Sequence, residues 1–123
     1  MRLANRETDV LSSCLEWLRM KGVWCWRQNQ GAIPLKSGGY RRFVGLKGVA
    51  DILGILPQTV CVVGDDGPVT FGNLLAVETK RHGENPRPEQ VEFLRLVNER
   101  GGVGVCVHSV SELEEALASY LDS

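Results

Sequence analysis

The chain has 123 residues, of which 43% are hydrophobic and 24% are charged, and its formal net charge is −1. These proportions are those of one ordinary soluble globular domain, which we expect to span residues 1–123. The apolar runs are far shorter than the ~20 residues that cross a bilayer. The first ten residues, MRLANRETDV, lack the apolar stretch of a signal peptide. We therefore expect a cytoplasmic protein with no membrane partner.

The near-neutral total conceals an uneven distribution of charge. No acidic residue lies between Glu16 and Asp51, and that interval holds Arg19, Lys21, Arg27, Lys36, Arg41, Arg42 and Lys47. After Arg100 the balance reverses, because the remaining residues include acids but no lysine or arginine. A basic first half creates the kind of local field that attracts phosphates, although chance also produces such asymmetry.

The cysteines do not form a metal-binding pattern. Cys14, Cys25, Cys61 and Cys106 are far apart, each lies in an apolar segment, and the chain has only two histidines. A zinc site is therefore not expected. We predict that the cysteines are small buried hydrophobic residues in a reducing compartment.

The first half of the chain predicts a helix, a strand and a long connection. Asn5 can cap a helix that ends at Gly22, with an apolar stripe of Leu11, Cys14, Leu15 and Leu18. The segment VWCWRQN (23–29) is typical of a strand. Residues 30–49 form a basic, glycine-rich connection, and a connection of that length is usually functional or mobile.

The second half predicts an alternation of strands and helices. ADILGIL (50–56) and TVCVVG (59–64) indicate adjacent strands broken at Pro57, and LLAVETK (74–80) indicates a central strand. A helix with Pro88 in its first turn stops at Gly101 and is followed by the strand VGVCVH (103–108). The last helix starts at Ser111, has Glu114 in a capping box, and directs inward Leu113, Leu117, Tyr120 and Leu121. This order predicts an α/β domain around a mixed sheet.

Three polar residues occupy positions where apolar residues are expected. Glu7 continues the stripe of the first helix, and Gln90 shares a helical face with Leu94 and Val97. Asp51 opens an apolar strand directly after the basic connection. Taken singly, each has an ordinary structural explanation: a charge at a helix N-terminus, a satisfied amide at a helix end, and a turn cap.

The strand LLAVETK adds two charges at its end. Glu78 and Lys80 are two residues apart, so they point to the same face of the sheet. If the strands that carry Asp51 and Glu78 pair, the two carboxylates meet at one sheet edge. Carboxylates at such an edge suit the hard-oxygen chemistry of magnesium, which activates water and offsets charge on a phosphate. A structural ion pair between Glu78 and Lys80 is the alternative.

Short motifs along the whole chain resemble those of a nuclease family. GVAD (48–51) followed by VETK (77–80) is similar to the PD-(D/E)XK signature, with Asp51, Glu78 and Lys80 in its three named positions. With Glu7, RQNQG (27–31), GLKGVADILG (45–54) and PEQVEFLRLVNERGGVGVCV (88–107), the chain resembles the virus-type replication-repair nuclease (VRR-NUC) domain. One position departs from the pattern, because Ala50 replaces the usual proline before the aspartate. That proline shapes the backbone but supplies no ligand.

The resemblance implies a fold and a set of roles. The implied fold is α/β with a restriction-endonuclease-like core, a mixed central β-sheet flanked by helices. The implied ligands of Mg²⁺ or Mn²⁺ are Glu7, Asp51, Glu78 and the backbone carbonyl of Thr79. Lys80 would be the catalytic lysine, and Gln90 would support the site from its helix.

The resemblance also implies a substrate. Stand-alone members of the family, in phages and bacteria, are similar to Holliday-junction resolvases that act as homodimers on branched, four-way DNA. The expected activity is therefore metal-dependent endonucleolytic hydrolysis of DNA phosphodiester bonds in a bacterial or phage-infected cell. The alternatives are a nuclease directed to flaps, nicks or ends, and a DNA-binding subunit that does not cleave. The expected DNA-facing residues are Arg27, Lys36, Arg41, Arg42, Lys47, Arg81 and Arg87.

Overall fold

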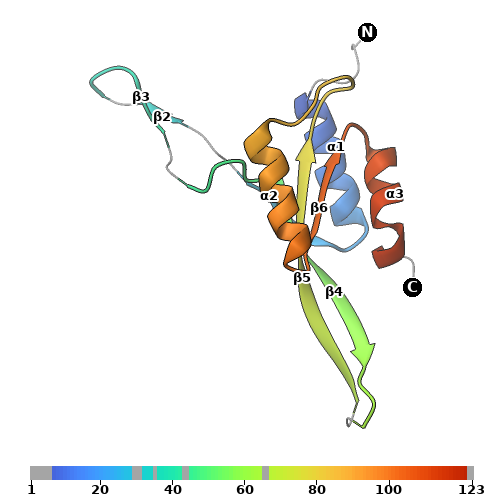
Figure 1. The fold of residues 1–123 in the computed structure, drawn as a ribbon. Helices are drawn as coiled ribbons and strands as arrows, with labels where there is room; N and C mark the ends of the chain where they lie inside the picture. Colours follow the sequence, from blue (N-terminus) through green and yellow to red (C-terminus); the bar gives the residue numbers. More distant parts are fainter. Residues whose placement is uncertain (1–6, 29–31, 35, 43–44, 65–66, 122–123) are drawn as a thin grey trace.

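The computed structural model describes residues 7–28, 32–34, 36–42, 45–64 and 67–121 (Figure 1). Its elements, in chain order, are α1 (Glu7–Met20), β1 (Trp24–Arg27), β2 (Ala32–Pro34), β3 (Tyr40–Arg42), β4 (Ile52–Cys61), β5 (Pro68–Thr79), α2 (Pro88–Glu99), β6 (Val103–Val107) and α3 (Val110–Leu121). Within this part of the chain, no helix is long and apolar enough to cross a membrane.

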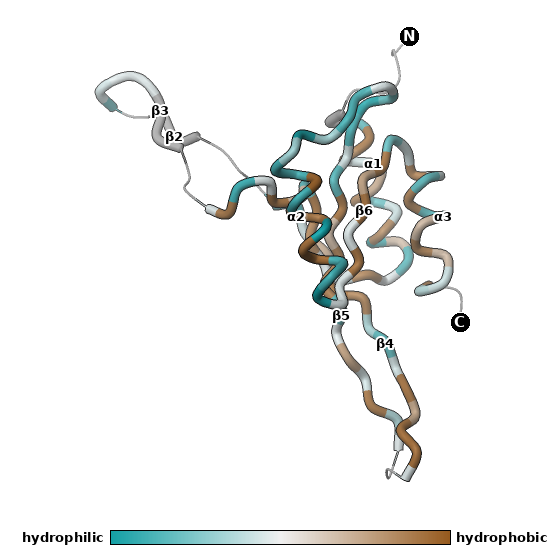
Figure 2. The backbone as a smooth tube through the Cα atoms, viewed as in Figure 1, coloured by the Kyte–Doolittle hydropathy of each residue, from teal (hydrophilic) through white to brown (hydrophobic). Residues whose placement is uncertain are grey.

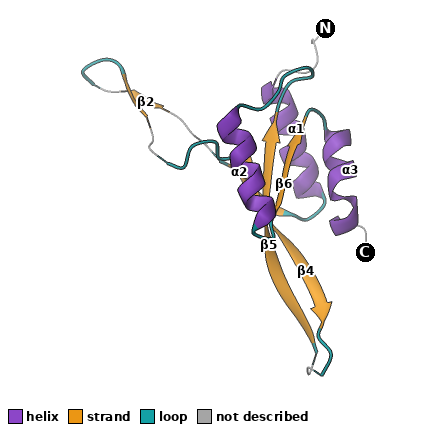
Figure 3. Ribbon diagram, in the orientation of Figure 1, coloured by secondary structure: helices purple, strands orange, loops and turns teal. Residues whose placement is uncertain are grey.

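The main sheet has four strands in the order β1-β4-β5-β6. The β1–β4 and β4–β5 pairs are antiparallel, whereas β5 and β6 are parallel. One face of the sheet is covered by α2 and the other by α1 and α3 (Figure 3). The predicted α/β domain around a mixed sheet, with helices on its faces and a central strand near residue 75, is therefore confirmed.

The strand β5 builds a core on each face of the sheet because its side chains alternate. Leu75 and Val77 pack in the larger cluster, which also contains residues of α1 and α3 such as Leu18 and Leu117. Ala76 lies in the smaller cluster with Leu94 of α2. The even-numbered positions at the end of β5 are therefore directed to the α2 face.

The predicted strand break at Pro57 is wrong. Residues 52–61 form one continuous strand, in which Pro57 lies opposite Gly72 of β5. The pairing of β1 with β4 ends at Ile55, so Pro57 lies on an edge of the sheet, where a proline is tolerated. The strand β5 likewise begins at Pro68, six residues before the predicted start at Leu74.

The long connection also contains structure that the sequence pattern did not indicate. Ala32–Pro34 and Tyr40–Arg42 pair as the antiparallel ribbon β2–β3, which projects away from the main sheet (Figure 1). Its exposed turn includes Lys36, Gly38 and Gly39. The two glycines adopt positive φ angles of 89° and 83°, which glycine alone adopts readily.

Three smaller predictions are corrected by the structure. The last helix is capped at Ser109 rather than Ser111, because the Ser109 Oγ accepts a bond from the Glu112 amide at 3.1 Å. Tyr120 is 44% exposed instead of directed inward. Cys14 and Cys25 are buried as predicted, but Cys106 is only partly buried and Cys61 is exposed, because the end of β4 extends beyond the core.

Candidate active site

The pairing of β4 with β5 brings Asp51 to the end of β5. Ile52 pairs with Val77, so Asp51, just before β4, lies beside the C-terminal end of β5. The Asp51 Oδ2 atom accepts two hydrogen bonds from Thr79, one from its backbone amide and one from its Oγ1, both at 2.9 Å. These bonds hold the aspartate against the strand that carries Glu78.

Glu78 is a buried carboxylate that α2 contacts directly. Its side chain is only 1% exposed, and its Oε1 accepts a hydrogen bond from the Gln90 Nε2 at 3.1 Å. Gln90 is itself buried, and its Oε1 accepts the backbone amide of Arg87 at 2.8 Å. The amide of Gln90 therefore links the first turn of α2 to the acidic end of β5, on the face where the helical pattern placed it.

Lys80 follows directly on β5 and is 7% exposed. Its backbone amide donates to the Val107 carbonyl at 3.0 Å, so the pairing with β6 extends to this residue. The alternation of strand side chains directs Lys80 to the face that Glu78 occupies. A lysine is almost never this buried unless something compensates its charge, and we expect the carboxylate of Glu78, on the same face, to do so.

The pKa of the Cys106 thiol, on β6, is shifted by burial and by the charges around it. This pKa is raised to about 11, chiefly by burial and then by the negative charge of Glu78, while the positive charge of Lys80 opposes the shift. A thiol with this pKa stays protonated at neutral pH and is a poor nucleophile. Cys106 is therefore not a candidate nucleophile.

Gly48 packs the connection before Asp51 against α2, and the motif pattern did not reveal this role. It has a φ of +79°, and a Cβ atom there would lie 2.1 Å from the Glu89 carbonyl oxygen. The signal that marks it is its place in GLKG, three residues before the aspartate. Only a glycine allows this close approach, which positions Asp51 near the start of α2.

Gly48→Ala is expected to lower the free energy of unfolding by about 1–3 kcal/mol, because it adds a strained φ and a backbone clash. Urea unfolding followed by circular dichroism measures the change. Gly45→Ala is the matched control, since a Cβ at Gly45 meets nothing within 4 Å. Equal stability of the two variants would contradict a packing role for Gly48.

The donor set at this edge fits a hard divalent cation. Asp51 and Glu78 offer carboxylate oxygens from neighbouring strands, and such oxygens are the ligands that Mg²⁺ and Mn²⁺ prefer. In the described part of the chain, no group of three or more His, Cys, Asp or Glu residues could hold a metal ion. The third predicted ligand, the Glu7 side chain, lies outside the described side chains. The N-terminal end of α1, where Glu7 stands, lies at the same edge as the end of β5 (Figure 1).

His108 links the segment between β5 and α2 to α3 by hydrogen bonds. Its Nε2 lies 2.8 Å from the Glu84 carbonyl oxygen, and its Nδ1 lies 3.1 Å from Glu112 Oε1. The bond to the Glu84 carbonyl, and then the bond to Glu112, raise the pKa of His108 above its ordinary value of 6.5. The sequence had indicated only a residue at a strand end, which is where it stands, directly after β6.

His108→Gln is expected to destabilise the fold by less than about 1 kcal/mol, since the pair is partly exposed. A raised folded-state pKa gives stability that is fully present below pH 6.5 and is lost as the pH rises through the folded pKa. The difference in unfolding free energy between wild type and variant should therefore be larger at pH 6 than at pH 8.5. A difference that grows with pH would refute this assignment.

The predicted DNA-facing cations lie in two parts of the chain, residues 27–47 and residues 81–87. Arg27, Lys36 and Lys47 are exposed, whereas Arg41 and Arg42 lie in β3, where the backbone alone is described. Arg81 and Arg87 flank the segment that leads to α2, and each contacts an acid: Arg81 Nε donates to Glu84 at 2.7 Å, and Arg87 Nε lies 3.0 Å from Glu89. A phosphate near these two arginines would compete with those carboxylates.

No family model matches this chain, and neither a curated protein nor a solved structure does. The functional assignment is therefore carried by the residues and by their geometry.

Proposed function

We propose that the protein is a metal-dependent endodeoxyribonuclease of the virus-type replication-repair nuclease kind, with a restriction-endonuclease-like core. One observation supports this most strongly. Asp51 lies 27 residues before Glu78 in the sequence and Gln90 lies 12 residues after it, yet strand pairing and hydrogen bonds bring them together at the end of the sheet where Lys80 follows β5. A structural ion pair alone needs neither a buried glutamine on a buried glutamate nor an aspartate bonded to the same strand end.

Each residue has a separate task in this proposal. Asp51 and Glu78, with Glu7 and the Thr79 carbonyl, would hold Mg²⁺ or Mn²⁺, which lowers the pKa of bound water and offsets charge on the phosphate. Thr79 orients Asp51 through two hydrogen bonds. Gln90 orients Glu78, and Lys80 places a cation where negative charge develops in the transition state.

The proposed substrate is branched DNA, and the proposed active form is a homodimer. The basic stretch between Glu16 and Asp51 supports nucleic acid as the partner, because its exposed cations include Arg27, Lys36 and Lys47. The β2–β3 ribbon, which carries Arg41 and Arg42, projects from the body and can reach DNA beyond the site (Figure 1). A nuclease for flaps, nicks or ends is the second candidate, supported by the same site.

A substrate panel tests the proposal. The purified protein is incubated with end-labelled four-way, flap and linear duplex DNA, with Mn²⁺ or with EDTA. We expect Mn²⁺-dependent cleavage that is fastest on the four-way junction. Faster cleavage of the flap would favour the second candidate, and binding without any cleavage would favour a DNA-binding subunit.

Replacing Arg41, Arg42 and Lys47 together with Ala is expected to weaken binding of all DNA structures. Each lost phosphate contact should reduce the slope of log K against log salt by ~0.9. Fluorescence anisotropy at several salt concentrations measures both effects. Arg95→Ala is the control, because Arg95 lies on α2 and bonds Glu92 and Glu99. An unchanged slope in the triple variant would move the DNA surface elsewhere.

A further inference from the structure

The outer half of the β4–β5 hairpin extends beyond the rest of the sheet. We define it as the outer ribbon, residues 56–64 and 67–74. Pairing of β1 with β4 stops at Ile55, and pairing of β6 with β5 begins at Leu75, so both edges of the outer ribbon are open in the described residues. Figure 1 shows it projecting away from the three helices. A two-stranded ribbon is marginal in water by itself, and open edges tend to pair with other chains.

The two strands of the outer ribbon carry exposed apolar side chains and no charged ones. Residues 56–64 and 67–74 include no Asp, Glu, Lys or Arg, and the two residues that join these segments in the sequence are Asp65 and Asp66. Val63 is 101% exposed, Phe71 53% and Val62 48%. Figure 2 shows hydrophobic segments along both strands out to the far end. With no Lys or Arg, and with two aspartates between its strands, the outer ribbon is a poor surface for phosphates. Along the strands themselves, no charged side chain protects the open edges.

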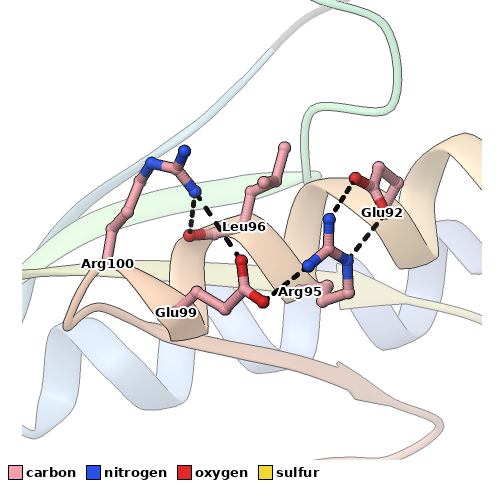
Figure 4. Close-up of polar contacts among 5 residues, drawn as sticks. All are labelled: Glu92, Arg95, Leu96, Glu99 and Arg100. Atoms are coloured by element: carbon pink, nitrogen blue, oxygen red, sulfur yellow. Dashed lines mark hydrogen bonds and ion pairs between the residues drawn. The ribbon is translucent and has the colours of Figure 1, made fainter.

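An apolar groove of about 540 Å³ lies at the base of the outer ribbon. Leu74 contributes from β5, Leu46 from the connection before Asp51, and Phe93 and Leu96 from α2. Arg100, at the C-terminal end of α2, also lines it, while its guanidinium donates to the Leu96 carbonyl at 3.5 Å (Figure 4). On the same helix, Glu92 and Glu99 both accept hydrogen bonds from Arg95.

We propose that the outer ribbon and this groove form the interface with a second copy of the chain. Two outer ribbons that pack antiparallel about a two-fold axis place the far end of each ribbon near the groove of the other. The exposed apolar side chains of each ribbon then meet the apolar recess of the other copy, and Arg100 in the lining of that recess can offset the negative charge of Asp65 and Asp66. The ribbon and groove together supply about two dozen residues, within the ~20–30 that one side of a stable interface uses. The same patch then serves both subunits, as two-fold symmetry requires.

This inference rests on the proposed function only in that both call for a homodimer. The outer ribbon lies at the end of the sheet opposite to the candidate site, since β5 runs from Pro68 in the ribbon to Thr79 at the site. An interface there does not cover the end of the sheet that carries the buried Glu78 and Lys80 in either subunit. Substitutions that disrupt the interface are therefore expected to abolish dimerisation and to leave the nicking of single strands intact.

The first test is the mass of the protein in solution without DNA, measured by light scattering. Wild type should have the mass of a dimer, twice 13.6 kDa. Phe71→Asp and, separately, Val63→Asp should be monomers with unchanged circular dichroism. Tyr120→Asp is the matched control: it places the same charge at an exposed aromatic residue of α3 and should stay dimeric. Two ribbon sites are used so that a folding defect in one leaves the other informative.

Several results would overturn the interface. They are a monomeric wild type, a dimer that survives both ribbon substitutions, or a dimer lost equally in Tyr120→Asp. A monomeric wild type that binds neutral phosphatidylcholine vesicles would assign the outer ribbon to a lipid surface instead.

The second test distinguishes this proposal from the proposed function. Phe71→Asp should still nick DNA one strand at a time, but it should lose paired cuts on a four-way junction. If wild type never cleaves DNA while its dimer still depends on Phe71, the interface stands and the nuclease assignment fails. If wild type cleaves as a monomer, the nuclease stands and the interface fails.

Discussion

Glu78→Gln, and separately Asp51→Asn, are expected to reduce DNA cleavage by at least ~10²-fold, the scale of losing one transition-state stabiliser. Each substitution removes a negative charge and keeps a side-chain oxygen. In Glu78→Gln that oxygen can still accept the bond from the Gln90 Nε2, and in Asp51→Asn it can still accept the Thr79 amide. The loss should therefore report on metal binding and not on a collapsed fold. Initial rates on a labelled four-way junction measure it.

The stability of these two variants provides the control. Glu78 is 1% exposed, and an ionised carboxylate is costly to bury unless other groups compensate it. Its neutral amide isostere should leave the unfolding free energy within about 1.5 kcal/mol of wild type. Binding of junction DNA should also persist. Cleavage within a few-fold of wild type by either variant would sink the assignment of the two carboxylates as ligands.

Lys80→Met is expected to slow cleavage by at least ~10²-fold with little change in DNA affinity. Methionine keeps an unbranched apolar stem in a position that is 7% exposed, so packing is retained while the cation is lost. Single-turnover rates at saturating protein separate the chemical step from binding. The neighbouring cation supplies the comparison, because Arg81 is exposed and bonds Glu84. Arg81→Met should weaken binding modestly and leave the single-turnover rate nearly unchanged.

A Lys80→Met enzyme that cleaves as fast as wild type would show that the lysine is a structural partner of the nearby carboxylates. This structural ion pair was the alternative that the sequence left open. Equal slowing by Lys80→Met and Arg81→Met would instead indicate a general effect of positive charge near the DNA.

The sequence predicted that Asp51 and Glu78 lie together because a hairpin of two paired strands brings the residues at its open end side by side. Asp51 and Glu78 lie on either side of one hairpin, and period-two alternation directs Glu78 and Lys80 to one face. Gln90 was found for a similar reason: its helical position relative to Leu94 and Val97 placed it on the buried face.

Features set by tertiary context were not predictable from local patterns. Pro57 reads as a strand break, yet β4 continues through it because β1 has already ended. Ser109 and Ser111 each precede a glutamate by three residues, so the sequence pattern fits both, and the structure shows that the Ser109 Oγ accepts the Glu112 amide. The role of Gly48 depends on a helix 40 residues further along the chain.

The central claim is that Asp51 and Glu78 bind the divalent metal with which the protein hydrolyses DNA. Its most direct test is Mn²⁺ binding, measured by electron paramagnetic resonance in the presence of a four-way junction. Lys80→Met protein serves as the reference, because it keeps both carboxylates and leaves the junction largely intact. We predict saturable Mn²⁺ binding that weakens by at least ~10-fold when Glu78→Gln is added to Lys80→Met. Equal Mn²⁺ binding by the single and double variants would contradict the claim.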